Sequence, residues 1–105
     1  MKKYPPSISD EEMEIRMLRK DPRWVTEYLN AHMEVAFEEN EPELLLLALA
    51  RVAKARGIAH VAKSVSVKRE SLHRMLSKRG NPQWDSLFRI FKALHLRLKL
   101  EPVPA

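Results

Sequence analysis

The sequence predicts an all-α protein of five or six helices, with a short strand near the C-terminal end. Three observations lead to this prediction. Apolar residues recur at helical spacing along most of the chain, prolines and glycines separate the periodic stretches, and one pair of short stretches is spaced as a helix–turn–helix. At 105 residues, the chain is long enough for one domain with a single modest core.

The domain is expected to span residues 21–105, and the first twenty residues are expected to form an N-terminal extension to it. Residues 1–8 contain Pro5 and Pro6 and have no hydrophobic period, so we expect an extended arm there. A helix is predicted from Ser9, whose hydroxyl can cap it, and Glu12 stands at capping-box spacing. This helix has a thin apolar edge, which either packs on the domain or is kept for a partner protein.

A second helix is expected after the Asp21–Pro22 step, where the aspartate can cap and the proline fits the first turn. Its apolar stripe includes Val25 and Leu29 and repeats as far as Phe37. A third helix is expected to begin at Pro42 and to end at Gly57. Because this third stretch is apolar almost all round, we expect it to be the central helix of the core.

Residues 58–76 have the pattern of two short helices joined by a tight turn. The predicted buried positions of this pair recur at helical spacing and are Ile58, Val61, Ala62, Val65, Leu72, Met75 and Leu76. Val67 in the turn is expected to fill the space between the helices. Outward-facing positions of the second helix carry Arg69, Glu70 and Arg74, which are side chains that can reach bases and phosphates.

The last helix is predicted over residues 84–94, with Trp84 as a packing residue at its start. Residues 96–100 then alternate apolar and basic side chains, which is typical of a strand. A single strand has no partner within an otherwise helical chain. We therefore expect Leu96, Leu98 and Leu100 to form a dimer strand that pairs with a second copy, or to extend the sheet of another protein.

The charge of the chain is divided unevenly between its halves. Residues 1–56 hold 9 Lys and Arg against 11 Asp and Glu, a net charge of −2, whereas residues 57–105 hold 10 against 3, a net charge of +7. The helix–turn–helix pattern lies in the basic half. Charge and helix pattern together favour a polyanion such as double-stranded DNA as the partner of that half.

Several functional classes have little support in the sequence. The chain has no cysteine, the two glycines make no phosphate-binding loop, and its histidines are not spaced as metal ligands, so we expect neither an enzyme nor a cofactor or metal site. No signal peptide is apparent. The longest apolar run, residues 44–50, is far shorter than the roughly 20 residues that cross a bilayer. A soluble cytoplasmic protein without membrane contact is expected.

The chain resembles a known family on several short strings taken in order. Residues 58–94 are similar to a lambda-repressor or Xre-type helix–turn–helix, and residues 21–98 resemble the HigA-like family of addiction-module antidotes. The strings that carry this resemblance are residues 27–31, 41–44, 53–57, 69–72, 80–82, 92–94 and 96–98. The resemblance implies a five- or six-helix lambda-repressor-like domain from a bacterium or a phage, with its helix–turn–helix core at residues 58–94.

The resemblance also implies an antitoxin of a type II toxin–antitoxin module. Such proteins neutralise a RelE/ParE-like toxin and, as homodimers, bind operator DNA to repress their own operon. Two alternatives stay open from the sequence. One is a stand-alone Xre-like transcriptional regulator without a toxin, and the other is a protein-interaction module that has lost DNA binding.

The resemblance places Arg69 and Glu70 at positions that contact bases, and Arg74 lies one turn further along the same helical face. Glu70 either accepts from cytosine or orients one of the two arginines. The candidates for phosphate contact are Lys63, Lys68, Ser71, His73, Lys78 and Arg79.

Two residues depart from the pattern of the family. Ser66 stands where the turn usually has glycine, and Lys68 stands where the recognition helix usually has a capping serine or threonine. Both departures favour weaker DNA binding than the usual residues would give, unless the hydroxyl of Ser66 or Ser71 compensates.

Toxins of the superfamily that the resemblance implies tend to be basic, so an acidic surface is the expected docking site. The candidates lie in the acidic first half of the chain and are Glu34, Glu38, Glu39, Glu41 and Glu43. The N-terminal arm and residues 96–100 are rival surfaces, and the sequence does not choose among the three.

Overall fold

The computed structural model describes residues 10–105 and contains six α-helices within that range. They are α1 (Asp10–Lys20), α2 (Trp24–Glu38), α3 (Glu43–Arg56), α4 (Ile58–Ser64), α5 (Arg69–Met75) and α6 (Trp84–Ala93). The predicted all-helical architecture is therefore confirmed. The arm over residues 1–8 and the cap at Ser9 lie outside the described residues.

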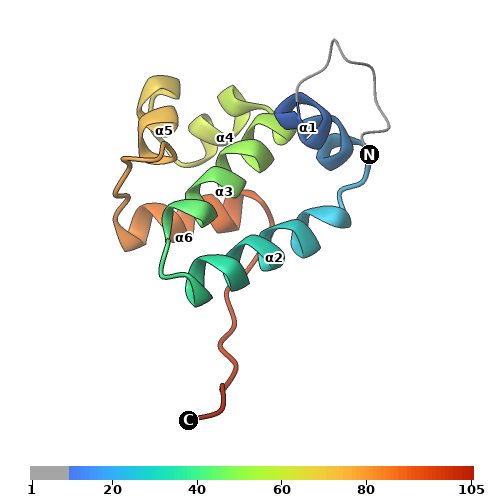
Figure 1. Cartoon of the computed structure of the whole chain (residues 1–105). Helices are drawn as coiled ribbons and strands as arrows, with labels where there is room; N and C mark the ends of the chain where they lie inside the picture. The colour runs from blue at the N-terminus through green and yellow to red at the C-terminus, as the bar shows by residue number, and fades with distance from the viewer. Residues whose placement is uncertain (1–9) are drawn as a thin grey trace.

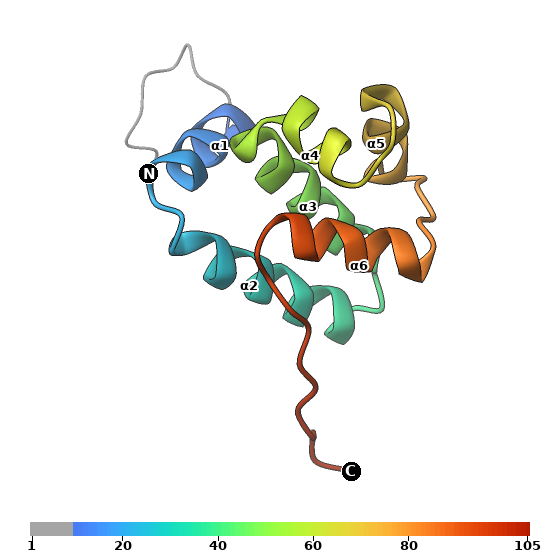
Figure 2. The same cartoon turned by 180° about the vertical axis from the view of Figure 1, so that it is seen from behind.

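The central position of α3 is confirmed, because it packs against α1, α2 and α4. Figures 1 and 2 show it running through the middle of the molecule. Ala48, Leu49, Val52 and Ala53 are fully buried along it. The helix ends at Gly57, whose φ of +104° is a conformation that residues with a Cβ rarely adopt. This glycine allows α4 to begin at the next residue.

The Asp21–Pro22 step sets the start of α2, although the helix itself begins two residues later than expected. The carboxylate of Asp21 accepts a hydrogen bond from the backbone N–H of Arg23 (3.2 Å), which closes a turn directly before the helix. Val25, Tyr28 and Leu29 are then buried against α3 and α1. The apolar stripe does not stay buried to its end, since Val35 and Phe37 are exposed.

The structure decides between the two interpretations of the first helix, because α1 packs firmly on α3. Leu18 is buried in the core and Ile15 packs against it, while Met17 faces solvent. Arg19 donates to the backbone carbonyls of Lys54 (3.4 Å) and Ala55 (3.3 Å), which belong to the last turn of α3. The carbonyls at a helix C-terminus lack partners inside the helix, so this side chain ties the two helices together.

The predicted helix pair is present as α4 and α5, which pack against each other. Of the predicted interior positions, Val61, Ala62, Val65, Leu72 and Leu76 are buried, and Ile58 and Met75 are partly buried against the core. Val67 also packs against the core from the turn, as expected. The arrangement is compatible with a helix–turn–helix domain.

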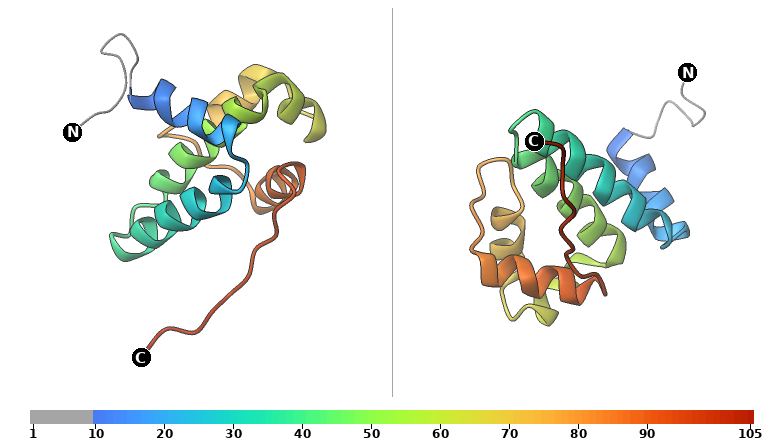
Figure 3. Two further views of the ribbon diagram at one scale, coloured as in Figure 1. Left: turned by 90° about the vertical axis from the view of Figure 1, so that its right-hand side faces the viewer. Right: turned by 90° about the horizontal axis from the view of Figure 1, so that it is seen from below.

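The expected C-terminal strand is not seen in the single chain, since residues 96–100 have no regular secondary structure. Leu96 still packs against the core, whereas Leu98 and Leu100 are exposed. Figure 1 and the left view of Figure 3 show this segment leaving the body of the molecule. Alternation describes a half-buried strand, but a strand also needs a hydrogen-bonding neighbour, and no other described segment is extended beside it.

The packing role expected for Trp84 is wrong. Ile90, Phe91 and Leu94 form the buried stripe of α6, but Trp84, the first residue of that helix, is 70% exposed. Its ring contacts Phe88 in an edge-to-face arrangement with centroids 5.8 Å apart, and Phe88 is exposed as well. The two aromatic rings form an apolar patch on the outside of α6.

Candidate nucleic-acid and partner surfaces

The three residues proposed to contact bases lie together on the outside of α5. Arg69 and Glu70 are the first two residues of the helix, Arg74 is in its last turn, and all three side chains are exposed. Leu72 on the opposite side of the helix is fully buried, which fixes the orientation of this face. Glu70 forms no ion pair with either arginine among residues 10–105, so the described chain leaves all three side chains open to a ligand.

The six candidates for phosphate contact surround this face. They lie on α4, at the start of α5, on α5 itself and in the turn that follows it. Five are exposed and Ser71 is partly buried. Within residues 10–105, Lys63, Lys68, Lys78 and Arg79 form no ion pair, so their charges are not neutralised by carboxylates of the described chain. Four free cations beside two free arginines make a surface suited to a polyanion.

The two departures from the usual pattern are visible in the backbone. Ser66 has a φ of +59°, in the left-handed region where glycine is favoured, and it is exposed. Lys68 is the N-terminal cap of α5 and has the extended backbone typical of a cap, but its side chain accepts nothing from the helix. No hydrogen bond from Ser66 or Ser71 replaces the missing cap within the described chain. The recognition helix therefore lacks one stabilising contact that a serine would supply.

The acidic surface lies away from α5, on the second half of α2, the α2–α3 connection and the start of α3. Four of its glutamates are exposed, and Glu43 is partly buried. Between Arg23 and Arg51 the sequence contains no lysine or arginine. Exposed apolar side chains, including Val35 and Phe37, stand among these carboxylates. A surface of this kind suits a basic partner that also carries apolar residues.

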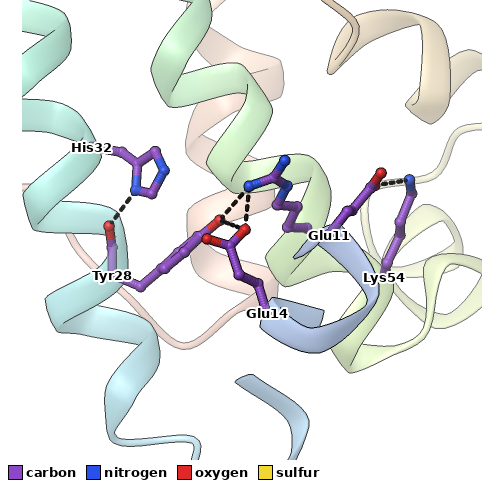
Figure 4. Close-up of polar contacts among 6 residues, drawn as sticks. Glu11, Glu14, Tyr28, His32 and Lys54 are labelled. Atoms are coloured by element: carbon purple, nitrogen blue, oxygen red, sulfur yellow. Dashed lines mark hydrogen bonds and ion pairs between the residues drawn. The ribbon is translucent and has the colours of Figure 1, made fainter. Parts of the chain in front are cut away.

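A polar network between α1, α2 and α3 was not predicted from the sequence. Arg51 donates to the carboxylate of Glu14 and to the hydroxyl of Tyr28 (3.3 Å), and that hydroxyl donates to Glu14 (3.3 Å). Lys54 forms a second ion pair with Glu11 at 2.8 Å (Figure 4). A signal did exist, because Glu11 and Glu14 on α1 are three residues apart, as are Arg51 and Lys54 on α3, which places each pair on one helical face.

The pKa values of Glu11 and Tyr28 are shifted within this network. The hydrogen bond from Lys54 lowers the pKa of Glu11, and burial raises the pKa of the Tyr28 hydroxyl. Both shifts belong to the contact that holds α1 in place. The network is therefore structural.

The histidines match their expected roles in part. His32 is partly buried at the edge of the core, as expected, and its Nδ1 donates to the backbone carbonyl of Tyr28 (2.8 Å). Residues 10–105 contain no cluster of histidines and carboxylates suited to a metal ion. Among the described helices, none is long and apolar enough to cross a membrane.

This geometry defines a small helical protein whose basic and acidic surfaces lie on different elements, a fold compatible with the helix–turn–helix class. Comparison with known proteins gives the family. Residues 11–102 match the family described as "Probable addiction module antidote protein", and the chain belongs to this family. An antidote is an antitoxin, so membership implies a toxin as partner.

A relative from Haemophilus influenzae (strain ATCC 51907 / DSM 11121 / KW20 / Rd), described as "Uncharacterized protein", is 31% identical over 75 residues. The match covers 71% of this chain and 77% of that relative. No solved structure shows significant similarity to the chain.

Proposed function

We propose that this protein is the antitoxin of a type II toxin–antitoxin module, of the HigA-like kind with a lambda-repressor or Xre-type helix–turn–helix. It neutralises a RelE/ParE-like toxin by binding it, and it acts as a repressor of its own operon. It works by binding alone, without catalysis or a cofactor. Membership in the antidote family supports the antitoxin role.

The observation that carries DNA binding is the uncompensated basic face of α4 and α5. A recognition helix presents its first residues to base edges in the major groove, and Arg69, Glu70 and Arg74 are exposed in that manner. An arginine can donate two hydrogen bonds to guanine, which makes Arg69 and Arg74 the main base-reading residues. The surrounding lysines, Ser71, His73 and Arg79 hold the helix in register on the phosphates.

Two copies of the protein are proposed to bind together, because a palindromic operator matches a two-fold symmetric dimer with recognition helices about 34–36 Å apart. The C-terminal segment with Leu98 and Leu100 is the proposed contact between copies, since both leucines are exposed in the single chain. Its alternating pattern could become a strand only beside such a partner.

The test of DNA binding compares three variants on DNA from upstream of the protein's own reading frame. Arg69→Ala and Arg74→Ala should each weaken binding by about 1–3 kcal/mol and reduce sequence preference, because each removes a two-bonded base contact. Arg16→Ala is the matched control, since Arg16 is an exposed arginine on α1. Fluorescence anisotropy with operator and scrambled DNA measures both affinity and preference.

Unchanged operator preference in both α5 variants would show that the base-contact assignment is wrong.

The toxin role has a separate test, which is co-expression with the adjacent reading frames followed by co-purification. A small basic protein that co-purifies and is inhibited supports the antitoxin. Operator binding without such a partner would instead identify a stand-alone transcriptional regulator.

A further inference from the structure

One face of α3 is apolar but uncovered. A helix that is apolar all round is normally buried on every side. In α3, Leu46, Leu49 and Val52 are buried, but Leu47 is 41% exposed and Leu44 is only partly buried. Since both leucines lie one turn apart on the same face, the described chain leaves an apolar strip of its central helix open to solvent.

This strip is the floor of a groove of about 670 Å³. Leu44, Leu47 and Ala50 line its floor, α1 closes it at one end with Glu11, and the end of α5 forms the opposite wall with Leu76. Figure 1 shows α3 crossing the molecule between α1 and α5. A concave apolar floor can bury side chains of a partner more completely than a convex surface can.

The charges around the groove indicate the chemistry of its occupant. Arg51 and Lys54 line the groove but are already paired with Glu14 and Glu11 on α1. Glu41 and Glu43 line the end nearest the α2–α3 connection and form no ion pair within residues 10–105. On the α5 side, His73 and Lys78 complete the polar lining.

We infer that this groove seats an apolar segment of the toxin, whose neighbouring basic residues contact Glu41 and Glu43. This inference rests on the proposed function and deepens it, because it gives the toxin a docking site beside Glu41 and Glu43, two of the acidic candidates. Neither Val35 on α2 nor Phe88 on α6 lines the groove, so both can serve as controls. The three side chains are similarly exposed, at 41% for Leu47, 46% for Val35 and 52% for Phe88.

The experiment uses the absence of cysteine from the chain. Leu47→Cys, Val35→Cys and Phe88→Cys each introduce a single thiol, and each variant is co-expressed with the toxin from the adjacent reading frame. The rate of reaction with a maleimide dye is measured for the free protein and for the complex. In the complex, the Leu47→Cys thiol should react at least about tenfold more slowly, because it lies in the buried core of the interface. The other two thiols should keep their rates.

A second measurement shows how much the groove contributes to the affinity for the toxin. Leu47→Lys places a charge on the apolar floor and should weaken toxin binding about 30-fold or more, as loss of a central interface residue does. Phe88→Lys, on α6 and outside the groove, should leave the affinity unchanged. Thermal unfolding of each free variant shows whether it folds. If the Leu47→Lys variant does not fold, the thiol experiment alone tests the groove.

The outcomes separate this inference from the proposed function. A complex in which the Leu47→Cys thiol stays fully reactive overturns the groove and leaves the antitoxin role standing. Protection at Val35→Cys instead would move the docking site to the outer surface of α2. If no toxin binds the unaltered chain, the proposed antitoxin role and the groove assignment both fail.

Discussion

At the scale of single residues, three helices end in the same way without using glycine. Asn40, Ser66 and His95 follow α2, α4 and α6, and their φ angles are +55°, +59° and +61°. After α4, the N–H of Val67 donates to the carbonyl of Ala62 (3.0 Å), which is the longer bond of a Schellman motif. The chain has only two glycines, so residues with side chains occupy these left-handed positions.

These three helix ends show how far helix-ending residues can be predicted from the sequence. The resemblance placed Ser66 at a glycine position, and its positive φ confirms that expectation. Asn40 and His95 were not predicted as left-handed residues. Nothing in a lone asparagine or histidine distinguishes that conformation from a turn of another type, and the tertiary packing decides it.

We predict that Ser66→Gly stabilises the protein by about 0.5–1 kcal/mol. A left-handed residue with a Cβ costs about 1–2 kcal/mol, and glycine removes that cost while losing about 0.5–1 kcal/mol through its freer unfolded chain. The melting temperature should rise by about 3–6 °C. Thermal unfolding followed by circular dichroism measures the change.

Ser64→Gly is the matched control for this prediction. Ser64 is the last residue of α4 and donates from its hydroxyl to the carbonyl of His60 (3.0 Å). Glycine there should lower stability by about 0.5–1 kcal/mol, because glycine is a poor helix former. A loss of stability in both variants would contradict the strain assigned to Ser66.

At the scale of elements, the docking of α1 depends on polar contacts as well as on Leu18. Of the two α3 cations that pair with α1, Arg51 is the more buried, with 19% of its side chain exposed, and Lys54 has 38% exposed. The Nε atom of Arg51 is buried without a partner in the described chain. The Arg51 contact with Glu14 should therefore matter more than the Lys54 contact with Glu11.

We predict that Glu14→Ala destabilises the protein by about 1–3 kcal/mol, because it leaves a partly buried guanidinium without its carboxylate. Glu11→Ala is the matched control on the same helix, and its loss of a more exposed pair should cost about 0–1 kcal/mol. Urea unfolding of both variants measures the difference. Equal effects would show that burial of Arg51 does not strengthen its ion pair.

The pH dependence offers a second check on the α1 contact. Since the pKa of Glu11 is lowered in the folded protein from 4.5, its pair with Lys54 stabilises the fold fully above that value. The contribution is lost as the pH falls through the lower folded pKa. Wild type should therefore exceed Glu11→Gln in stability at pH 6, and the difference should disappear in more acidic solution.

The positions of the helices along the chain were predictable from the sequence, but the way the segments pack was only partly predictable. Hydrophobic period and the Asp21–Pro22 and Pro42 steps located the helices because these signals are local. The alternation at residues 96–100 does not give a strand in the single chain, because a strand depends on a neighbour that the pattern does not contain. Trp84 is two turns before the buried Phe91, but it is the first residue of α6 and stays exposed, and helical spacing does not say how far along a helix the core extends.

At the scale of the whole molecule, the charge division seen in the sequence becomes a division of surfaces. The glutamates between Arg23 and Arg51 lie on α2, in the α2–α3 connection and at the start of α3, and the proposed phosphate-contacting cations lie on α4, at the start of α5 and in the turn after α5. This separation could be predicted from composition alone. The groove beside α3 could not, because it depends on how α1 and α5 sit on either side of that helix.

The same division gives a prediction about DNA binding that depends on the assembly. Lys63, Lys68, Lys78 and Arg79 are the proposed phosphate contacts that carry a full charge, so each copy should displace about four counterions. The logarithm of the binding constant should fall against the logarithm of salt concentration with a slope of about −3.6 for one copy and about −7 for two. Anisotropy titrations of operator DNA between about 50 and 200 mM KCl measure this slope.

Substitution tells whether the slope belongs to these residues. Lys78→Ala removes one charge per copy and should make the slope of a dimer shallower by about 1.8, with little effect on operator preference. Lys20→Ala, an exposed lysine on α1, should leave the slope unchanged. A slope near −3.6 would mean that single copies bind, because half the expected counterions would then be released. A slope near zero would contradict phosphate binding by the α4–α5 face, since ion release follows from any contact of these charges with the duplex.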